Sequence, residues 1–93
     1  MNIRVYAPNQ IQHQLQALAS ESVEKLKSLF ERIKSAEVVF TEEGEKTVEM
    51  KLYLMRRVLY AAERGDAYED ALENALEKLR WQLMSYKKEV AIF

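Results

Sequence analysis

The sequence predicts an α+β fold, in which a four-stranded sheet carries two long helices on one face. Three short segments alternate between apolar and polar residues, and a fourth is too short and too rich in β-branched and aromatic residues to start a helix. Two longer segments repeat apolar residues every three or four positions, as amphipathic helices do. The order is β-α-β-β-β-α, and placing both helices on one face buries all the apolar stripes together.

A chain of ninety-three residues has room for only one hydrophobic core, because at this length folding buries only about 60 to 65% of the surface that the unfolded chain exposes. The composition, 48% hydrophobic and 31% charged, is that of a globular protein. We therefore expect a single domain over residues 1–93. The absence of cysteine excludes disulfides, thiolate zinc sites and cysteine nucleophiles. Because the first residues also lack the pattern of a secretory signal, we expect a cytoplasmic protein.

The first strand is predicted over residues 2–7, where Ile3 and Val5 share one side and Pro8 ends the alternation. The first helix follows, with Asn9 as its cap, and is predicted to extend over roughly 25 residues. Its core-facing stripe comprises Ile11, Leu15, Leu18, Ser22, Leu26, Leu29 and Ile33.

A hairpin is predicted next, from strands at residues 36–41 and 46–55. The polar segment between them contains Gly44, which can adopt the positive φ that a tight turn requires. The apolar face of the longer strand comprises Val48, Met50, Leu52 and Leu54. This face is expected to lie against the helices.

The last strand is predicted over residues 58–63, after a tight turn at residues 56–57, and Gly65 ends it. The second helix begins at about Asp66, which has Glu69 three positions later in the spacing of a capping box. Its inward-facing residues are Tyr68, Leu72, Ala75, Leu76, Leu79, Leu83 and Tyr86.

Catalytic chemistry is not indicated. The single histidine, His13, lies on the polar side of the first helix and is interpreted as a solvated surface residue. The five serines lie in no nucleophile elbow, and the two glycines form no phosphate-binding loop. The carboxylates of Glu42, Glu43 and Glu45 lack the fixed geometry of a cation site. We expect no enzyme activity, no metal, no cofactor and no small-molecule substrate.

The net charge of -1, from 14 basic and 15 acidic residues, taken by itself argues against nucleic acid as a partner. The distribution of charge points the other way. Six acids and one base lie between Glu63 and Glu77, and the bases follow them along the second helix. The helix macrodipole alone accounts for this order of signs, because acids near the start and bases near the end of a helix are each stabilising.

Basic residues also recur on defined sides of the two predicted helices. In the first helix, pairs seven positions apart fall within about 20° of each other, namely Lys25 with Arg32 and Lys27 with Lys34. In the second helix, one flank holds Lys78, Trp81, Ser85 and Lys88, and the opposite flank holds Arg80 and Lys87. If the helices lie side by side in the same direction, their basic ends converge into a stripe that can follow an RNA backbone.

Two apolar features have more than one interpretation. Trp81 lies off the core-facing line of its helix, so it either packs against neighbouring side chains or the chain end, or serves as a base-stacking platform or a protein-contact anchor. The tail from Val90 to Phe93 is expected to fold back over the domain, with a weak self-association contact as the alternative.

Two sets of residues together carry a family resemblance. The first closes the first helix and comprises Lys25, Leu26, Phe30, Arg32 and Ile33. The second spans the last strand and second helix and comprises Leu59, Ala61, Glu63, Asp66, Tyr68, Ala71, Ala75, Lys78, Leu79, Gln82 and Leu83. With these spacings, and over essentially its whole length, the chain resembles the ribosome hibernation-promoting factors, also called the protein Y or sigma-54 modulation family.

The resemblance implies a fold like that of double-stranded-RNA-binding domains and a role in stress or stationary phase that needs no catalysis. Members of the family bind the decoding channel of the small ribosomal subunit, occlude the mRNA and tRNA positions and hold idle ribosomes inactive. The implied partners are the small subunit and its rRNA, with no membrane. Because the chain ends after the second helix, the resemblance further implies a short form without a dimerisation domain.

The family's basic positions fall on four residues of this sequence, which are Lys25, Arg32, Lys78 and Lys88. The sequence departs from the family pattern at Ser28, Trp81 and Ser85, and the additional bases Lys27, Arg80 and Lys87 partly restore the count. Together with Trp81, these seven basic residues are the predicted rRNA contacts. The departures motivate an alternative, a protein-interaction module of the same fold that has lost rRNA binding and uses Trp81, Tyr53 and the tail.

Overall fold

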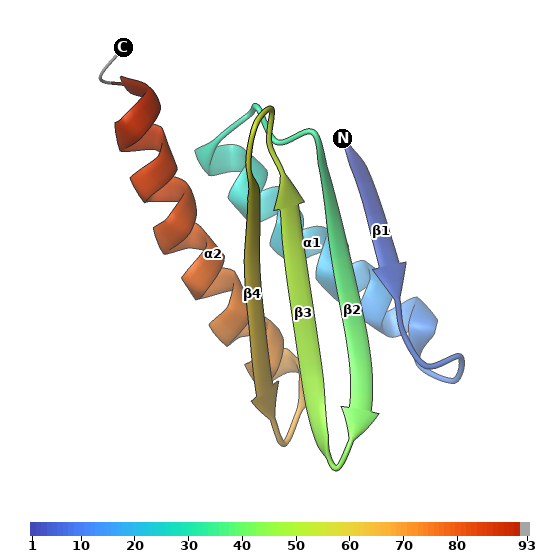
Figure 1. Cartoon of the computed structure of the whole chain (residues 1–93). Helices are drawn as coiled ribbons and strands as arrows, with labels where there is room; N and C mark the ends of the chain where they lie inside the picture. Colours follow the sequence, from blue (N-terminus) through green and yellow to red (C-terminus); the bar gives the residue numbers. More distant parts are fainter. Residues whose placement is uncertain (92–93) are drawn as a thin grey trace.

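The computed structural model describes residues 1–91, with the side chains of residues 1–89. The elements are β1 (Asn2–Tyr6), α1 (Gln12–Leu29), β2 (Ser35–Glu43), β3 (Glu45–Tyr53), β4 (Val58–Gly65) and α2 (Tyr68–Ala91). The sheet has the order β1-β2-β3-β4, with β1 parallel to β2 and the other neighbours antiparallel. Both helices cover the same face of the sheet and run in the same direction (Figure 1). The predicted α+β fold is confirmed.

The core lies between the inner face of the sheet and the two helices. All four residues of the predicted apolar face are buried, namely Val48, Met50 and Leu52 of β3 and Leu54, which follows it. On the helices, Val23, Leu26, Leu79 and Leu83 are at most 1% exposed. A fully buried Val or Leu side chain stabilises the fold by roughly 1.5 to 3 kcal/mol, so these residues fix both helices against the sheet.

The turn between β2 and β3 has the predicted glycine geometry. Gly44 has a φ of 87°, the only positive value in the described chain, and the pairing continues up to Glu43 opposite Glu45. Both strands of this hairpin are nine residues long, and β2 is therefore longer than the predicted residues 36–41. The hairpin itself is confirmed.

The first helix is shorter than the predicted 25 residues, and its end differs. It ends at Leu29, and Phe30 is extended at φ -154° and ψ 105°. The chain then joins the sheet, where the Lys34 amide donates to the Tyr53 carbonyl at 2.8 Å. Ile33 is buried, as predicted, but it reaches the core from the connection to β2 and not from a helix.

The predicted cap of this helix is also wrong. The N-cap residue is Ile11, and it makes no side-chain capping bond. The Ile11 amide donates to the Pro8 carbonyl at 3.1 Å, so residues 8–11 form a turn that holds Asn9 before the helix begins. Asn9 therefore lies inside this turn and not at the N-cap position, and the helix starts two residues later than predicted.

The second helix begins at Tyr68, two residues after the predicted start at Asp66. Tyr68 is 4% exposed, its hydroxyl donates to the Thr41 carbonyl at 3.2 Å, and its ring packs edge-on against Phe40 at 5.4 Å. These contacts join the first turn of α2 to β2. The helix therefore starts where its first core residue meets the sheet.

The molecule is elongated, with extents of 46 × 22 × 19 Å, and α2 extends beyond the sheet (Figure 1). None of the helices in the described chain is long and apolar enough to cross a membrane. The predictions for the tail concern side chains from Val90 to Phe93, which lie outside the described residues.

Candidate nucleic-acid interface

The C-terminal ends of the two helices meet at one end of the molecule. The Lys87 ammonium on α2 donates to the carbonyl oxygen of Leu29, the last residue of α1, at 2.8 Å. Beside this contact the rings of Phe30 and Tyr86 pack edge-on, with centroids 5.5 Å apart. The predicted side-by-side arrangement of the basic helix ends is therefore present in the structure.

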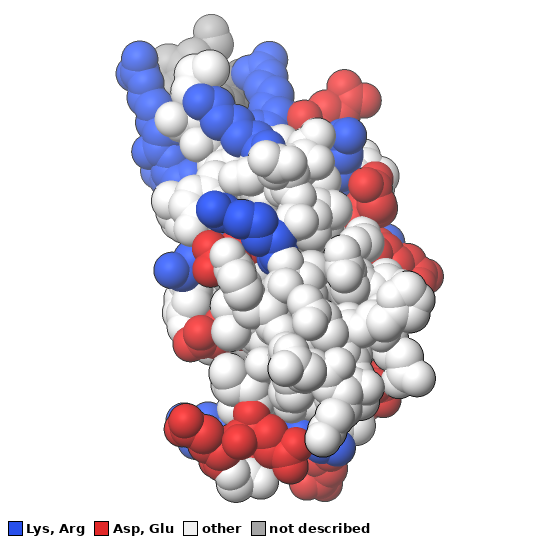
Figure 2. Space-filling model, turned by 90° about the vertical axis from the view of Figure 1, so that its right-hand side faces the viewer, with Lys and Arg blue, Asp and Glu red and all other residues white. Residues whose placement is uncertain are grey.

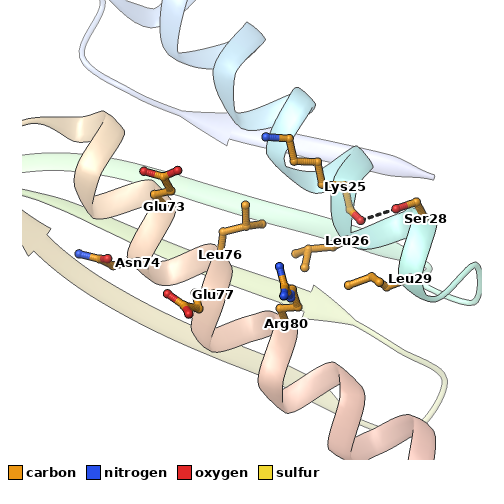
Figure 3. A pocket seen from close by; sticks show the side chains of 9 residues that line it. All are labelled: Lys25, Leu26, Ser28, Leu29, Glu73, Asn74, Leu76, Glu77 and Arg80. Atoms are coloured by element: carbon orange, nitrogen blue, oxygen red, sulfur yellow. Dashed lines mark hydrogen bonds between the residues drawn. The ribbon is translucent and has the colours of Figure 1, made fainter.

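A groove of about 640 Å³ lies between the helices, on the N-terminal side of this contact. Its apolar lining comes from Leu26, Leu29 and Leu76. Lys25 of α1 and Arg80 of α2 enter it from opposite sides (Figure 3). An apolar surface flanked by two cations can hold a phosphate above it and a base or ribose against it.

The groove also contains carboxylates that sequence reasoning did not place there. Glu73 and Glu77 of α2 line it together with Lys25 and Arg80 (Figure 3). Because like charges at a phosphate site weaken binding, these two residues limit the attraction of the groove for RNA. The stripe between the helices is thus mixed in charge and not purely basic.

The two predicted stripes on the first helix are not formed. Since α1 ends at Leu29, Arg32 and Lys34 lie in the connection to β2, and the 100° helical spacing does not apply to them. Lys27 lies with Glu24 and Glu31 around a shallow hollow, on a different side of α1 from the groove. Only Lys25 of the predicted residues on the first helix faces α2.

The flank of α2 that carries Lys78 faces β4 and not α1. The Lys78 ammonium lies 2.7 Å from a carboxylate oxygen of Glu63, and the Gln82 side-chain amide donates to the Tyr60 carbonyl at 2.8 Å. Both partners belong to β4, the edge strand. The prediction that Lys78 would lie in a stripe between the helices is therefore wrong, because the groove is lined by the opposite flank.

Trp81 is 63% exposed on the outer side of α2, and Lys88 is exposed near its end. This exposure contradicts close packing of Trp81 against neighbouring side chains, whereas packing against the chain end stays a prediction because the side chains of residues 90–93 lie outside the described part of the chain. The base-stacking and protein-contact interpretations both require an exposed ring, so both stay open. His13 is exposed on α1, as predicted.

The charges segregate along the long axis of the molecule (Figure 2). We define the basic end as the α1–β2 connection (residues 30–34), the β3–β4 turn (residues 54–57) and residues 86–91 of α2. It contains six basic residues, Arg32, Lys34, Arg56, Arg57, Lys87 and Lys88, and two acidic ones, Glu31 and Glu89.

The opposite end has the reverse balance. The acidic end consists of residues 42–46, around the β2–β3 turn, and residues 64–70, from the end of β4 to the first turn of α2. It contains the acids Glu42, Glu43, Glu45, Asp66, Glu69 and Asp70, and the bases Lys46 and Arg64. In Figure 2 most of the blue side chains lie towards one end of the molecule and a red cluster lies at the other, with further red side chains along one edge.

Sequence reasoning missed Arg56 and Arg57 as members of this surface, although it placed them in a turn. Their position at this end could have been predicted from the strand order. Successive antiparallel strands alternate in direction, so the turn between β3 and β4 returns to the end of the sheet from which β2 starts. The end of α1 must lie there too, because only a short connection joins it to β2.

Comparisons with known proteins agree with this fold. The family model described as "Sigma 54 modulation protein / S30EA ribosomal protein" matches residues 5–91. No curated relative matches the sequence. A solved ribosomal subunit interface protein from Coxiella burnetii is 20% identical with a TM-score of 0.83, covering 95% of this chain and 99% of that one. The N-terminal domain of protein Y from Thermus thermophilus is 19% identical with a TM-score of 0.82, covering 92% and 99%.

Proposed function

Because the chain belongs to the sigma 54 modulation protein / S30EA ribosomal protein family, we propose that it is a ribosome-associated translation inhibitor of the cytoplasm. The single domain binds rRNA in the decoding channel of the small subunit and stabilises ribosomes in an inactive state during stress or stationary phase. Its action is steric and electrostatic, and it needs neither a cofactor nor a catalytic residue.

The observation that carries this proposal is the segregation of charge. A polyanion responds to the local field and not to the net charge, so a molecule with a charge of -1 can still bind RNA through one end. Six basic residues against two acidic ones at the basic end provide that field. The acidic end has no such attraction for RNA, so the basic end is the one that faces it.

The predicted contacts fall into two groups in this proposal. Lys25 and Arg80 bind phosphates over the groove, while Arg32, Lys87 and Lys88 bind them at the basic end. Lys27, Lys78 and Trp81 lie on other sides of the helices and contribute less. Lys78 in particular must exchange the Glu63 carboxylate for a phosphate before it can contribute.

Co-sedimentation with purified small subunits tests the proposal. We expect the double reversal Lys25→Glu with Arg80→Glu to abolish binding, because it replaces two attractions by two repulsions. The matched control is Lys51→Glu with Arg64→Glu, which makes the same change of charge on exposed strand residues and should retain binding. Equal losses in the two doubles would show that only net charge matters.

The salt dependence of binding provides a second readout. Four to six phosphate contacts predict that log affinity falls with log salt at a slope of roughly -3 to -5. Salt-insensitive binding, or no binding of the wild-type chain to small subunits, would rule out the proposal.

One observation favours a second candidate, the protein-interaction module that has lost rRNA binding. The ring of Trp81 is largely exposed on the outer side of α2, and exposed tryptophans often anchor protein interfaces. In this case an affinity purification would recover a discrete protein partner and no ribosomal subunits, and Trp81→Ala would remove that partner.

A further inference from the structure

The turn between β3 and β4 combines charge with an exposed apolar side chain. Met55 is 72% exposed, more than any other large hydrophobic residue among residues 1–89. It is followed by Arg56, Arg57 and Val58, and Val58 is itself 51% exposed. Single exposed apolar side chains are common on protein surfaces, but Met55 and Val58 here flank two arginines within the basic end.

The turn is closed by a backbone hydrogen bond and contacts α2 through Arg57. The Leu54 amide donates to the Arg57 carbonyl at 2.8 Å and closes the turn. The Arg57 guanidinium lies 3.0 Å from a carboxylate oxygen of Glu89 and 5.2 Å from the centroid of the Tyr86 ring. Arg57 thus ties the turn to α2, beside the point where the two helix ends meet.

Arg56 differs from its neighbour. It is exposed, and it has no ion-pair partner among the side chains that the structure describes. Since no recorded carboxylate competes for its guanidinium, Arg56 is available for a ligand without the loss of an internal ion pair. The turn therefore presents an exposed guanidinium without an ion-pair partner and an exposed thioether on adjacent residues.

We propose that this turn is a second RNA contact, in which Arg56 binds a backbone phosphate and Met55 packs against an exposed base or ribose. This inference rests on the proposed function. An adjacent cation and apolar side chain match the alternation of phosphate and base along an RNA strand, and the surrounding basic end is complementary to a polyanion. Arg57 acts as a positioning residue, since its guanidinium is already bound within the protein.

The turn changes how the molecule would approach RNA. Lys25 and Arg80 line the groove between the helices, whereas the turn belongs to the basic end together with Arg32 and Lys88. The two contacts together place RNA around one end of the molecule. The acidic end then faces away from the RNA.

Small-subunit binding over a series of salt concentrations tests the contact with Arg56. We expect Arg56→Gln to weaken binding about 5- to 10-fold at low salt and to reduce the magnitude of the salt slope by about 1. Arg64→Gln removes the same charge at the acidic end and should change binding less than twofold. Arg56→Lys should preserve the slope, because lysine retains the phosphate contact.

The contact of Met55 is apolar, so its loss should lower the affinity without changing the salt dependence. We expect Met55→Ser to weaken binding about 5-fold with an unchanged salt slope, whereas Met55→Leu should bind as the wild type does. The chain contains no cysteine, so Met55→Cys can carry a single photoreactive group. Crosslinks from this position to rRNA are expected, and crosslinks to ribosomal protein alone would overturn the assignment of RNA as the partner.

The outcomes separate this inference from the proposed function. If Lys25→Glu with Arg80→Glu abolishes binding while Arg56→Gln and Met55→Ser bind as the wild type does, the second contact is wrong and the proposed function stands. If the wild-type chain itself does not bind small subunits, both are wrong. Circular dichroism of each variant verifies that it is folded, and both changes are at exposed positions.

Discussion

The Lys87 ammonium lies 2.8 Å from the carbonyl oxygen of Leu29 and joins the ends of the two helices. The last carbonyls of a helix have no partner within it, and they carry the negative end of the helix dipole. A lysine from α2 thus caps α1. One residue thereby connects the packing of the helices with the charge of the basic end.

Replacement of Lys87 is expected to reduce stability. Lys87→Met retains the apolar stem but removes the charged donor, so we expect the free energy of unfolding to fall by about 0.5 kcal/mol. Urea unfolding measures this change. Lys51→Met removes a charge from an exposed strand position and should change stability by a smaller amount. Equal changes in the two variants would contradict a capping role.

The ion pair between Lys78 and Glu63 is expected to be weak despite its 2.7 Å separation. The Lys78 side chain is 56% exposed, so solvent screens the attraction. A double-mutant cycle with Lys78→Met and Glu63→Gln should give a coupling below about 1 kcal/mol that decreases further in 1 M salt. A coupling that high salt leaves unchanged would instead indicate a contact that is not ionic.

The two glycines are expected to respond differently to alanine. At Gly44 the φ of 87° strains any side chain although the space around it is open, so Gly44→Ala should lower the free energy of unfolding by about 1 kcal/mol. At Gly65 a Cβ would meet its nearest atom at 3.5 Å, an ordinary contact. Gly65→Ala should therefore be neutral or stabilise slightly, by up to about 1 kcal/mol. Thermal melting of the two variants provides the comparison.

Tyr68 is expected to make stability depend on pH in the alkaline range. Burial, and secondarily the charge of Glu42, raise the pKa of Tyr68 above its ordinary value. The folded state therefore holds this proton more tightly than the unfolded state does. The associated stability is present below about pH 10 and is lost as the pH rises through the folded pKa.

The variant Tyr68→Phe separates this effect from the titration of lysines. It removes the hydrogen bond to the Thr41 carbonyl, so stability at neutral pH should fall by about 1 kcal/mol. Above about pH 10 its stability should decline less steeply than that of the wild type. Urea unfolding at a series of pH values measures both, and parallel curves would exclude Tyr68 as the cause.

Elements with local signals were predicted well from the sequence. The alternation of Val48, Met50 and Leu52 defines a buried strand face, and Gly44 marks the turn before it. The end of the first helix had no such signal. Ile33 continues the helical spacing, but the chain leaves the helix after Leu29 because strand pairing with β3 competes for the following residues. That competition depends on residues distant in the sequence.

The groove between the helices could also be predicted only in part, because local patterns define the flanks of a helix but not its neighbours. A helical wheel gives the two flanks of α2, with Lys78 on one and Arg80 on the other. Which flank faces α1 depends on the lateral position of α2 on the sheet. That position cannot be inferred from a single sequence. The presence of Glu73 in the groove follows from that position and was missed as well.

These carboxylates provide the last prediction. If RNA lies over the groove, Glu73 and Glu77 repel its phosphates, and the double variant Glu73→Gln with Glu77→Gln should bind small subunits about 3- to 10-fold more tightly at low salt. The matched control, Glu42→Gln with Glu43→Gln, removes two charges at the acidic end.

Even at 0.1 M salt charges are screened beyond about 10 Å, and the molecule is 46 Å long, so the control should change affinity by less than twofold at that concentration. Filter binding or co-sedimentation at two salt concentrations measures both doubles. Equal effects of the two would mean that RNA does not lie over the groove. Binding would then depend on the basic end alone, because that end contains six basic residues and only two acidic ones.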